Sequence, residues 1–164
     1  MSYTTLMLFS GILLVTNLAP SEAVDQVVMP IKSVTPGAID SKVTQDNIMS
    51  TICVVGYTKG VRPPVSYTGA LKAKQLRSTY KRYNNTNNKD FEEDHLIPLA
   101  LGGSPSSEEN LWPQPLNDKK GAYLKDEVEL KLHTLVCKGR VKLLEAQRAI
   151  ADDWYAAYLK YKKY

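Results

Sequence analysis

An acid and a histidine stand next to each other at Asp94 and His95, and two carboxamides follow at Asn110 and Asn117. Carboxylate and amide oxygens are the ligands that a hard divalent cation prefers, and an imidazole can take a proton from water near neutral pH. The chain holds only 2 histidines, and His95 is the one that directly follows an acid. Because the chain is also basic, these residue types predict a metal ion that activates water beside a phosphodiester.

Short elements of regular structure are expected to position these side chains. Residues 91–95 alternate weakly between apolar and polar and predict a strand, and residues 111–112 predict a second strand that pairs with it. A loop is expected between them, over the Gly-Gly-Ser-Pro run at 102–105. A helix over about 117–136 has apolar side chains at helical spacing and would pack across both strands. This unit would bring the acid, the histidine and the second carboxamide to one edge.

Taken in order, these residues resemble the HNH family of ββα-metal nucleases. The family pattern is an Asp-His pair, an apolar segment with proline, a Gly-Gly loop, an Asn-Leu pair, and an Asn or His at the start of a helix. The matching positions are Asp94-His95, residues 96–99, Gly102-Gly103, Asn110-Leu111 and Asn117. The match covers about thirty of the 164 residues, and the flanks look like a subgroup of secreted bacterial HNH-like proteins.

The resemblance implies a role for each matched residue. His95 would be the general base that activates water, and Asp94 would bind one divalent cation. Asn117 would supply a second metal ligand from the helix. Asn110 would complete the catalytic set by bracing the loop so that His95 points correctly. The implied metal is Mg²⁺, with Mn²⁺ or Zn²⁺ as alternatives.

One departure from the family pattern concerns the third site residue. Many members carry two Cys-x-x-Cys pairs that hold a structural zinc, whereas this chain has Trp-Pro-Gln-Pro-Leu at residues 112–116. We expect a disulfide and the flanking helices to replace that zinc knuckle. The difference also leaves the register of Asn117 open, with Tyr123 and Asp126 as alternative site residues.

Residues 1–23 have the pattern of a secretory signal peptide. An apolar, uncharged run at residues 6–15 leads into small residues at Ala19 and Ala23, and it is short for a membrane-spanning helix. Export to a secreted or periplasmic location is therefore predicted, with a retained anchor or a cytosolic segment as the alternatives. Residues 24–164 would form a single domain.

Cysteine usage agrees with export. Cys53 and Cys137 form an even set in a chain expected to leave the reducing compartment, which predicts a disulfide between them. The bridge would close a loop of about 85 residues, which contributes on the order of 4 to 5 kcal/mol in the chain-entropy model. Two unrelated buried thiols are the alternative.

Basic side chains gather on a helix expected over about residues 68–83. The cluster consists of Lys72, Lys74, Arg77, Lys81 and Arg82. The net charge of the chain is +4, and an excess of Lys and Arg suits a polyanion through the release of counterions. Contact with nucleic-acid phosphates, DNA rather than RNA, is one interpretation of the cluster, and a plain solvated helix face is the other.

The fold class expected is α+β, with a small ββα-metal motif of two short antiparallel strands and a helix in a mainly helical framework that has one disulfide. The leading function is a metal-dependent endonuclease of low sequence specificity. A secreted, non-catalytic module that binds nucleic acid or another partner on the same scaffold is the first alternative. A hydrolase of another ester, with His95 as base, is the second. We expect a monomer with no stable membrane association once the signal segment is removed.

Overall fold

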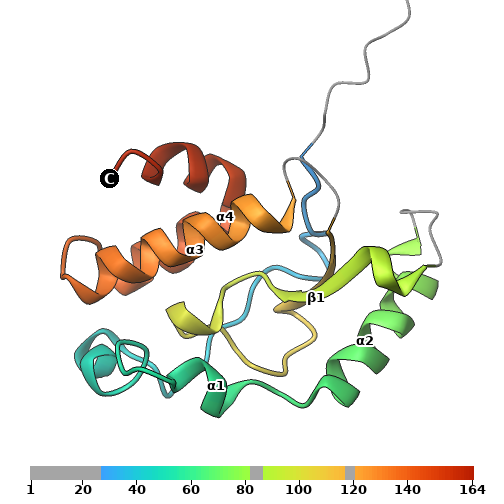
Figure 1. The fold of residues 1–164 in the computed structure, drawn as a ribbon, viewed down its shortest axis with the longest axis horizontal. Coiled ribbons are helices and arrows are strands. Elements are labelled where there is room, and N and C mark those ends of the chain that lie inside the picture. Colours follow the sequence, from blue (N-terminus) through green and yellow to red (C-terminus); the bar gives the residue numbers. More distant parts are fainter. Residues whose placement is uncertain (1–26, 82–86, 117–120) are drawn as a thin grey trace, which may run out of the picture.

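The computed structural model of the chain describes residues 27–81, 87–116 and 121–164 (Figure 1). The expected signal segment, Arg82 and Asn117 lie outside the described residues. With η denoting a 3-10 helix, the elements in chain order are η1 Gln45–Ser50, α1 Tyr57–Val61, α2 Val65–Arg77, η3 Asn88–Asp90, β1 Phe91–His95, η4 Leu99–Leu101, β2 Leu111–Pro115, α3 Ala122–Cys137 and α4 Leu143–Tyr161.

β1 and β2 form a two-stranded antiparallel sheet. Asp94 lies opposite Trp112 and His95 lies opposite Leu111 in the register of the pair. α3 follows β2 along the chain, which confirms the expected order of strand, loop, strand and helix. The expected mixed fold of helices and a small antiparallel sheet is confirmed with it. The expectation that α3 packs across both strands is wrong: α2 packs on β1 and β2, whereas α3 packs mainly on α4 and η4.

β2 is longer than the two residues expected and contains Pro113 and Pro115. Hydrogen-bonded and non-bonded pairs alternate along an antiparallel ladder. The backbone N–H of Leu116 donates to the Asp90 carbonyl at 2.9 Å just beyond the strands, so the pairs at both prolines are of the non-bonded kind. Neither proline therefore removes a ladder hydrogen bond, which is why the strand continues through them.

α2 starts and stops earlier than expected. It begins directly after Pro64, whose φ of −59° suits a helix start, and it ends at Arg77. Lys81 therefore lies beyond the helix, directly after the turn at residues 78–80. α3 starts at Ala122, later than expected. Within the described parts of the chain, no helix combines the length and the apolar composition needed to cross a bilayer.

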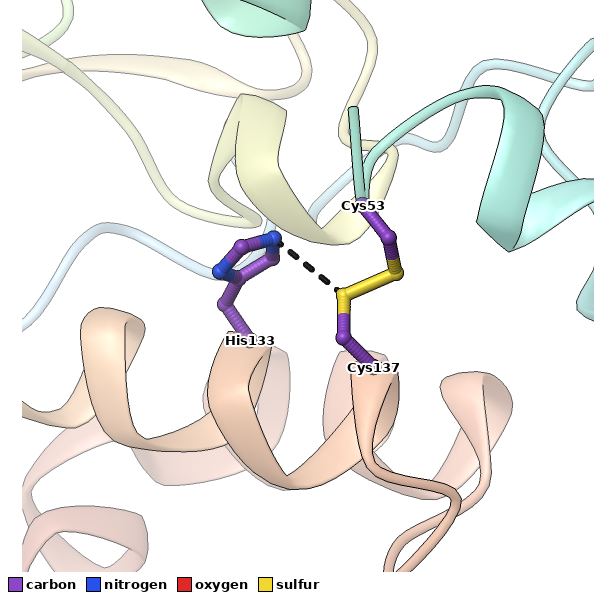
Figure 2. Close-up of side chains that lie close together, drawn as sticks. All are labelled: Cys53, His133 and Cys137. Atoms are coloured by element: carbon purple, nitrogen blue, oxygen red, sulfur yellow. Dashed lines mark hydrogen bonds between the residues drawn. A yellow bond between two sulfur atoms is a disulfide. The ribbon is translucent and has the colours of Figure 1, made fainter. Parts of the chain in front are cut away.

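A disulfide joins Cys53, in the segment after η1, to Cys137 at the end of α3 (Figure 2). The expected bridge is confirmed, and neither cysteine is free. His133 lies one turn before Cys137, and its ring Nε2 is 3.4 Å from the Cys137 Sγ and 2.9 Å from the carbonyl oxygen of Ile52. The bridge ties two segments that are 84 residues apart in the sequence.

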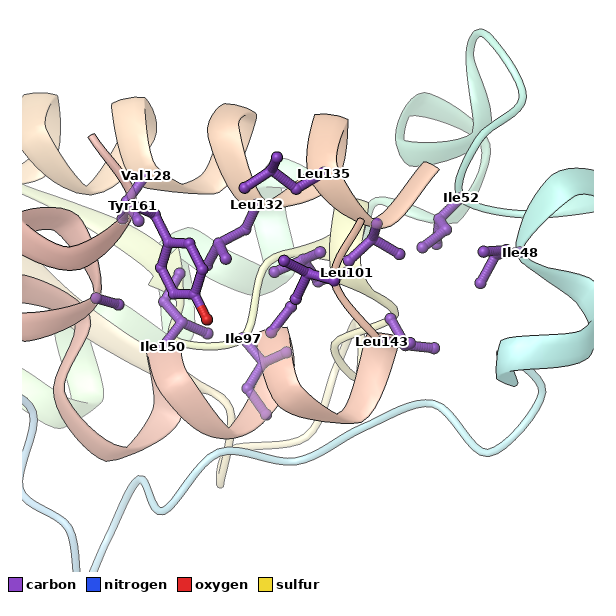
Figure 3. Packing of buried hydrophobic residues seen from close by; sticks show 14 of the residues in the cluster. Ile48, Ile52, Ile97, Leu101, Val128, Leu132, Leu135, Leu143, Ile150 and Tyr161 are labelled. Atoms are coloured by element: carbon purple, nitrogen blue, oxygen red, sulfur yellow. The ribbon is translucent and has the colours of Figure 1, made fainter. Parts of the chain in front are cut away.

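The main hydrophobic core lies between α3, α4, η4 and the segment around η1 (Figure 3). Leu132 of α3 and Ile150 of α4 are fully buried in it, and burying a side chain of this size stabilises a fold by about 1.5 to 3 kcal/mol. A second, smaller cluster contains Trp112 and Leu96. Because Ile97 belongs to the main core, the chain that leaves β1 enters both clusters in consecutive residues. The end of β1 is thereby fixed.

Candidate functional site

A pocket of about 140 Å³ opens at the end of β1. Asp94 and His95 both line it, so the expected acid and base face the same cavity. The other lining residues are Arg62, Glu92, Glu93, Pro98, Leu99, Asp126 and Glu129. They come from the segment after α1, from β1, from the turn into η4 and from the first half of α3.

His95 is buried, with 5% of its surface exposed, and one ring nitrogen is in a hydrogen bond. Its Nε2 lies 2.8 Å from the main-chain carbonyl oxygen of Pro105. A carbonyl can only accept, so Nε2 carries the proton and Nδ1 of the neutral ring keeps its lone pair. Burial lowers the pKa of His95, which favours the neutral ring at pH 7. This state is the one that a general base requires.

The loop between the strands holds the Pro105 carbonyl in place. Asn110 is fully buried there, and its side-chain amide donates to the carbonyls of Ile97 at 2.9 Å and Ser104 at 3.0 Å. Its Oδ1 accepts from the backbone N–H of Ile97 at 2.9 Å. A Cβ at Gly103 would lie 1.8 Å from the Ile97 carbonyl oxygen, so only glycine fits. The asparagine thus braces the loop that orients the histidine.

The carboxylate of Asp94 has two donors on one oxygen. Its Oδ2 accepts from the indole N–H of Trp112 at 3.0 Å and from the ammonium of Lys125 at 2.7 Å. Trp112 is fully buried and lies opposite Asp94 in the sheet, so the two side chains share a face. The acid is therefore held from β2 and from α3 at once.

Lys125 is the centre of a buried charge cluster that the sequence patterns do not indicate. Its side chain is fully buried, and its ammonium bonds Asp94, Glu129 of the same helix, and the main-chain carbonyl of His95 at 2.9 Å. An ammonium has three protons, so these three contacts use them all. Burial lowers the pKa of Lys125, but the charges of Asp94 and Glu129 outweigh burial and leave the pKa above its usual value. The lysine is therefore charged.

Acidic side chains outnumber basic ones around the pocket. The carboxylates are Glu92, Glu93, Asp94, Asp126 and Glu129, and the cations are Arg62 and Lys125. Burial, with the charge of Asp94 second, raises the pKa of Glu92 to about 7 and the pKa of Glu93 to about 8. Like charges repel strongly where water is scarce, so each further ionisation in this pocket costs free energy. A bound cation would relieve that repulsion.

Glu93→Gln is expected to stabilise the protein above neutral pH. Within the described chain neither carboxylate oxygen of Glu93 has a hydrogen-bond partner, and its folded pKa of about 8 is far above the ordinary 4.5. Between these two values the unfolded state releases its proton and the folded state keeps it, so stability falls as pH rises through that window. The glutamine variant lacks this loss, and its free energy of unfolding should exceed the parent's by roughly 1 to 3 kcal/mol at pH 8.5.

Urea unfolding of parent and Glu93→Gln protein at pH 8.5 and at pH 4 measures this difference. At pH 4 the glutamate is protonated in both states, so the two proteins should then be about equally stable. A difference of the same size at both pH values would contradict the burial of an ionising group at this position.

Lysine ammonium groups cover the outer edge of β1. Lys72 of α2 donates to the carbonyl of Phe91 at 2.6 Å and to that of Asn88 at 2.8 Å. Lys125 does the same for the carbonyl of His95 at the other end of the strand. Both strand carbonyls belong to non-bonded pairs and point away from β2, so the two lysines satisfy groups that an edge strand leaves open.

The rest of the basic cluster lies on the surface. Lys74 pairs with Glu108 at 2.9 Å, and both side chains are more than half exposed, so this pair contributes little to stability. Arg77 and Lys81 are exposed, and Arg82 lies outside the described residues. Contact of this cluster with nucleic-acid phosphates stays a prediction.

One group of side chains in the described residues could hold a metal ion by proximity alone. It consists of Cys53, His133 and Cys137, whose ligand atoms lie within 4.8 Å of one another (Figure 2). Both sulfur atoms are in the disulfide, however, and the thiolate is the form that binds metals. No three carboxylates in the described chain come this close around Asp94, where the Lys125 ammonium lies. Their oxygens are nonetheless the donor type that Mg²⁺ and Mn²⁺ prefer.

Part of this pocket carries weak signals in the sequence. Glu92 is two positions before Asp94 and shares its face of the strand, and Glu129 is four positions after Lys125 and shares its side of the helix. Neither spacing shows that this face of the strand and this side of the helix line the same pocket. Of the two alternative site residues, Asp126 lines the pocket, whereas Tyr123 is 77% exposed and does not.

Comparison of the chain with family models, with curated proteins and with solved structures finds no match. The resemblance to HNH nucleases therefore depends on the ordered residues around Asp94 and His95.

Proposed function

We propose that the protein is a metal-dependent endonuclease that hydrolyses phosphodiester bonds in DNA with little sequence preference. The observation that carries the proposal is the state of His95, whose Nε2–H is fixed on the Pro105 carbonyl beside a cluster of carboxylates. In this role Nδ1 accepts a proton from water, and the resulting hydroxide attacks phosphorus while the leaving oxygen departs.

The carboxylates of the pocket would hold the metal. Asp94 is the central ligand, Glu92 and Asp126 are its acidic neighbours, and Asn117 is the ligand expected from the segment before α3. A bound Mg²⁺ or Mn²⁺ would neutralise the charge that develops on the phosphate. The charge of the pocket supports this requirement, because a surplus of carboxylates repels a phosphate unless a cation is bound. Arg62, an exposed cation of the pocket, is suited to a phosphate oxygen.

We also propose that the protein acts outside the cytoplasm. The Cys53–Cys137 disulfide is compatible with an oxidising compartment, and residues 1–23 carry the pattern of an export signal. Its substrate there would be DNA in the periplasm or outside the cell.

A non-catalytic DNA-binding module is the second candidate, and one observation favours it. The Lys125 ammonium bonds Asp94 Oδ2 at 2.7 Å, so a cation from the protein already neutralises the central carboxylate. If this pair excludes a metal, the pocket has a base but no metal ion to assist it. Salt-sensitive binding of DNA without cleavage is the behaviour expected of such a module.

Nicking of supercoiled plasmid by the purified protein tests the choice between the two. Mg²⁺, Mn²⁺ and Zn²⁺ would be supplied separately at low salt, and a chelator would serve as the control. We expect nicking with Mg²⁺ or Mn²⁺ and none with the chelator, because the pocket without a cation repels the phosphate. Binding of the plasmid without nicking under any metal would contradict the nuclease and support the module.

A further inference from the structure

We propose that Lys125 is a positioning residue of the candidate site, and that its ammonium competes with a divalent cation for the same oxygen of Asp94. The inference rests on the proposed function, since it concerns how the proposed nuclease holds its metal ligand and its base. Two distances carry it: 2.7 Å from Nζ to Asp94 Oδ2 and 2.9 Å from Nζ to the His95 carbonyl oxygen.

A single side chain of α3 thereby holds both members of the acid and base pair. The ammonium of Lys125 bonds the carboxylate of Asp94 directly. It holds His95 through the main-chain carbonyl of that residue, which fixes the end of β1 and the point from which the imidazole projects. Lys125 has no proton left for a substrate phosphate, because Glu129 takes the third. Its contribution to the proposed reaction therefore lies in positioning and charge, and it is not a phosphate ligand.

The charge of this buried cluster leaves room for another cation. With both acids ionised, Asp94 and Glu129 carry two negative charges against the single positive charge of Lys125. A surplus charge in a buried cluster is costly unless a further cation or water compensates it. Glu92 and Asp126 add two more carboxylates at the same pocket. The lysine thus balances part of the charge, and a divalent cation would balance more of it.

Competition and positioning predict opposite effects of removing the ammonium. Lys125→Met keeps an unbranched side chain as far as the Cε position and deletes the ammonium group, so Asp94 Oδ2 becomes available to an external cation in a more negative pocket. Affinity for Mn²⁺ should rise by about tenfold or more. The carboxylate and the strand end lose their brace, and kcat should fall by about 10- to 100-fold at saturating Mn²⁺. A residue that only fills space would produce neither change.

A charge-matched double variant separates the two effects. Lys125→Met combined with Glu129→Gln removes one positive and one negative charge, so the cluster keeps the parental net charge without the brace. Asp94 Oδ2 is free in this variant too, but the pocket is no more negative than in the parent. We therefore expect its Mn²⁺ affinity to rise by less than in the single variant, while kcat stays as low. The double variant has one buried acid fewer without a cationic partner than the single variant, so its fold should be more stable. It can therefore be measured if the single variant does not fold.

Two measurements are made on the parent and both variants. Isothermal titration calorimetry gives the affinity for Mn²⁺, and cleavage of a labelled DNA duplex at saturating Mn²⁺ gives kcat. Tighter Mn²⁺ binding with slower cleavage in the single variant, and a smaller gain in binding with equally slow cleavage in the double variant, would support the proposal. Parental kcat in either variant, or unchanged or weaker Mn²⁺ binding in Lys125→Met, would overturn it.

The two proposals fail in different ways. A parent that binds Mn²⁺ but cleaves no DNA refutes the nuclease, and the Mn²⁺ titrations of the variants still decide whether Lys125 competes with the metal. A parent that cleaves DNA while Lys125→Met behaves like it refutes only the role of the lysine. A parent that binds no Mn²⁺ at all overturns both.

Discussion

His95→Ala is expected to lower the rate of plasmid nicking by about 100- to 10,000-fold. The variant removes the ring whose Nε2–H is held on the Pro105 carbonyl, and with it the lone pair at Nδ1 that would take a proton from water. DNA affinity should change little, because no contact with a phosphate is removed. A gel assay that separates supercoiled from nicked plasmid in Mg²⁺ or Mn²⁺ resolves a change of this size, and circular dichroism reports whether the fold is kept.

His133→Ala is the matched control, since the chain contains 2 histidines and the other one lies beside the disulfide. Its ring lies 2.9 Å from the Ile52 carbonyl and does not line the pocket. The control should nick plasmid at the parental rate. Parental activity in His95→Ala protein would show that this histidine is not the base. Equal losses in the two variants would attribute the effect to instability.

Replacing Cys53 and Cys137 together by serine is expected to lower the free energy of unfolding by roughly 4 to 5 kcal/mol. The bridge joins residues 84 positions apart, and a cross-link over so long a loop removes much conformational freedom from the unfolded chain. A loss of this size is a large part of the 5 to 15 kcal/mol that is typical of a folded domain. Urea unfolding of parent and variant measures it directly.

Reduction of the parent with dithiothreitol should reproduce the loss seen in the double serine variant, because both remove the same cross-link. The serine variant itself should be insensitive to the reductant. A loss below about 1 kcal/mol would show that the unfolded chain is already restricted by residual structure, so that the bridge adds little.

Local sequence patterns are sufficient to predict the elements that position the candidate site. Strand alternation over 91–95 predicts β1, the Gly102-Gly103 pair predicts the loop after it, and the cysteine pair predicts the disulfide. These features depend on backbone preferences within a few residues or on simple pairing, so they are visible in one sequence. Asp94 and His95 stand out in the same way, because His95 is the one of the 2 histidines that directly follows an acid.

The partners of these side chains were decided only by the tertiary structure. No spacing in the sequence connects Asp94 to Lys125 or to the indole of Trp112, and none places the Pro105 carbonyl on His95. These contacts arise because strand pairing, the loop braced by Asn110 and the core packing of α3 bring segments that are distant in the sequence to the end of β1. The strength of a buried charge pair or hydrogen bond depends on that placement to within a fraction of an ångström, which local sequence preferences do not encode.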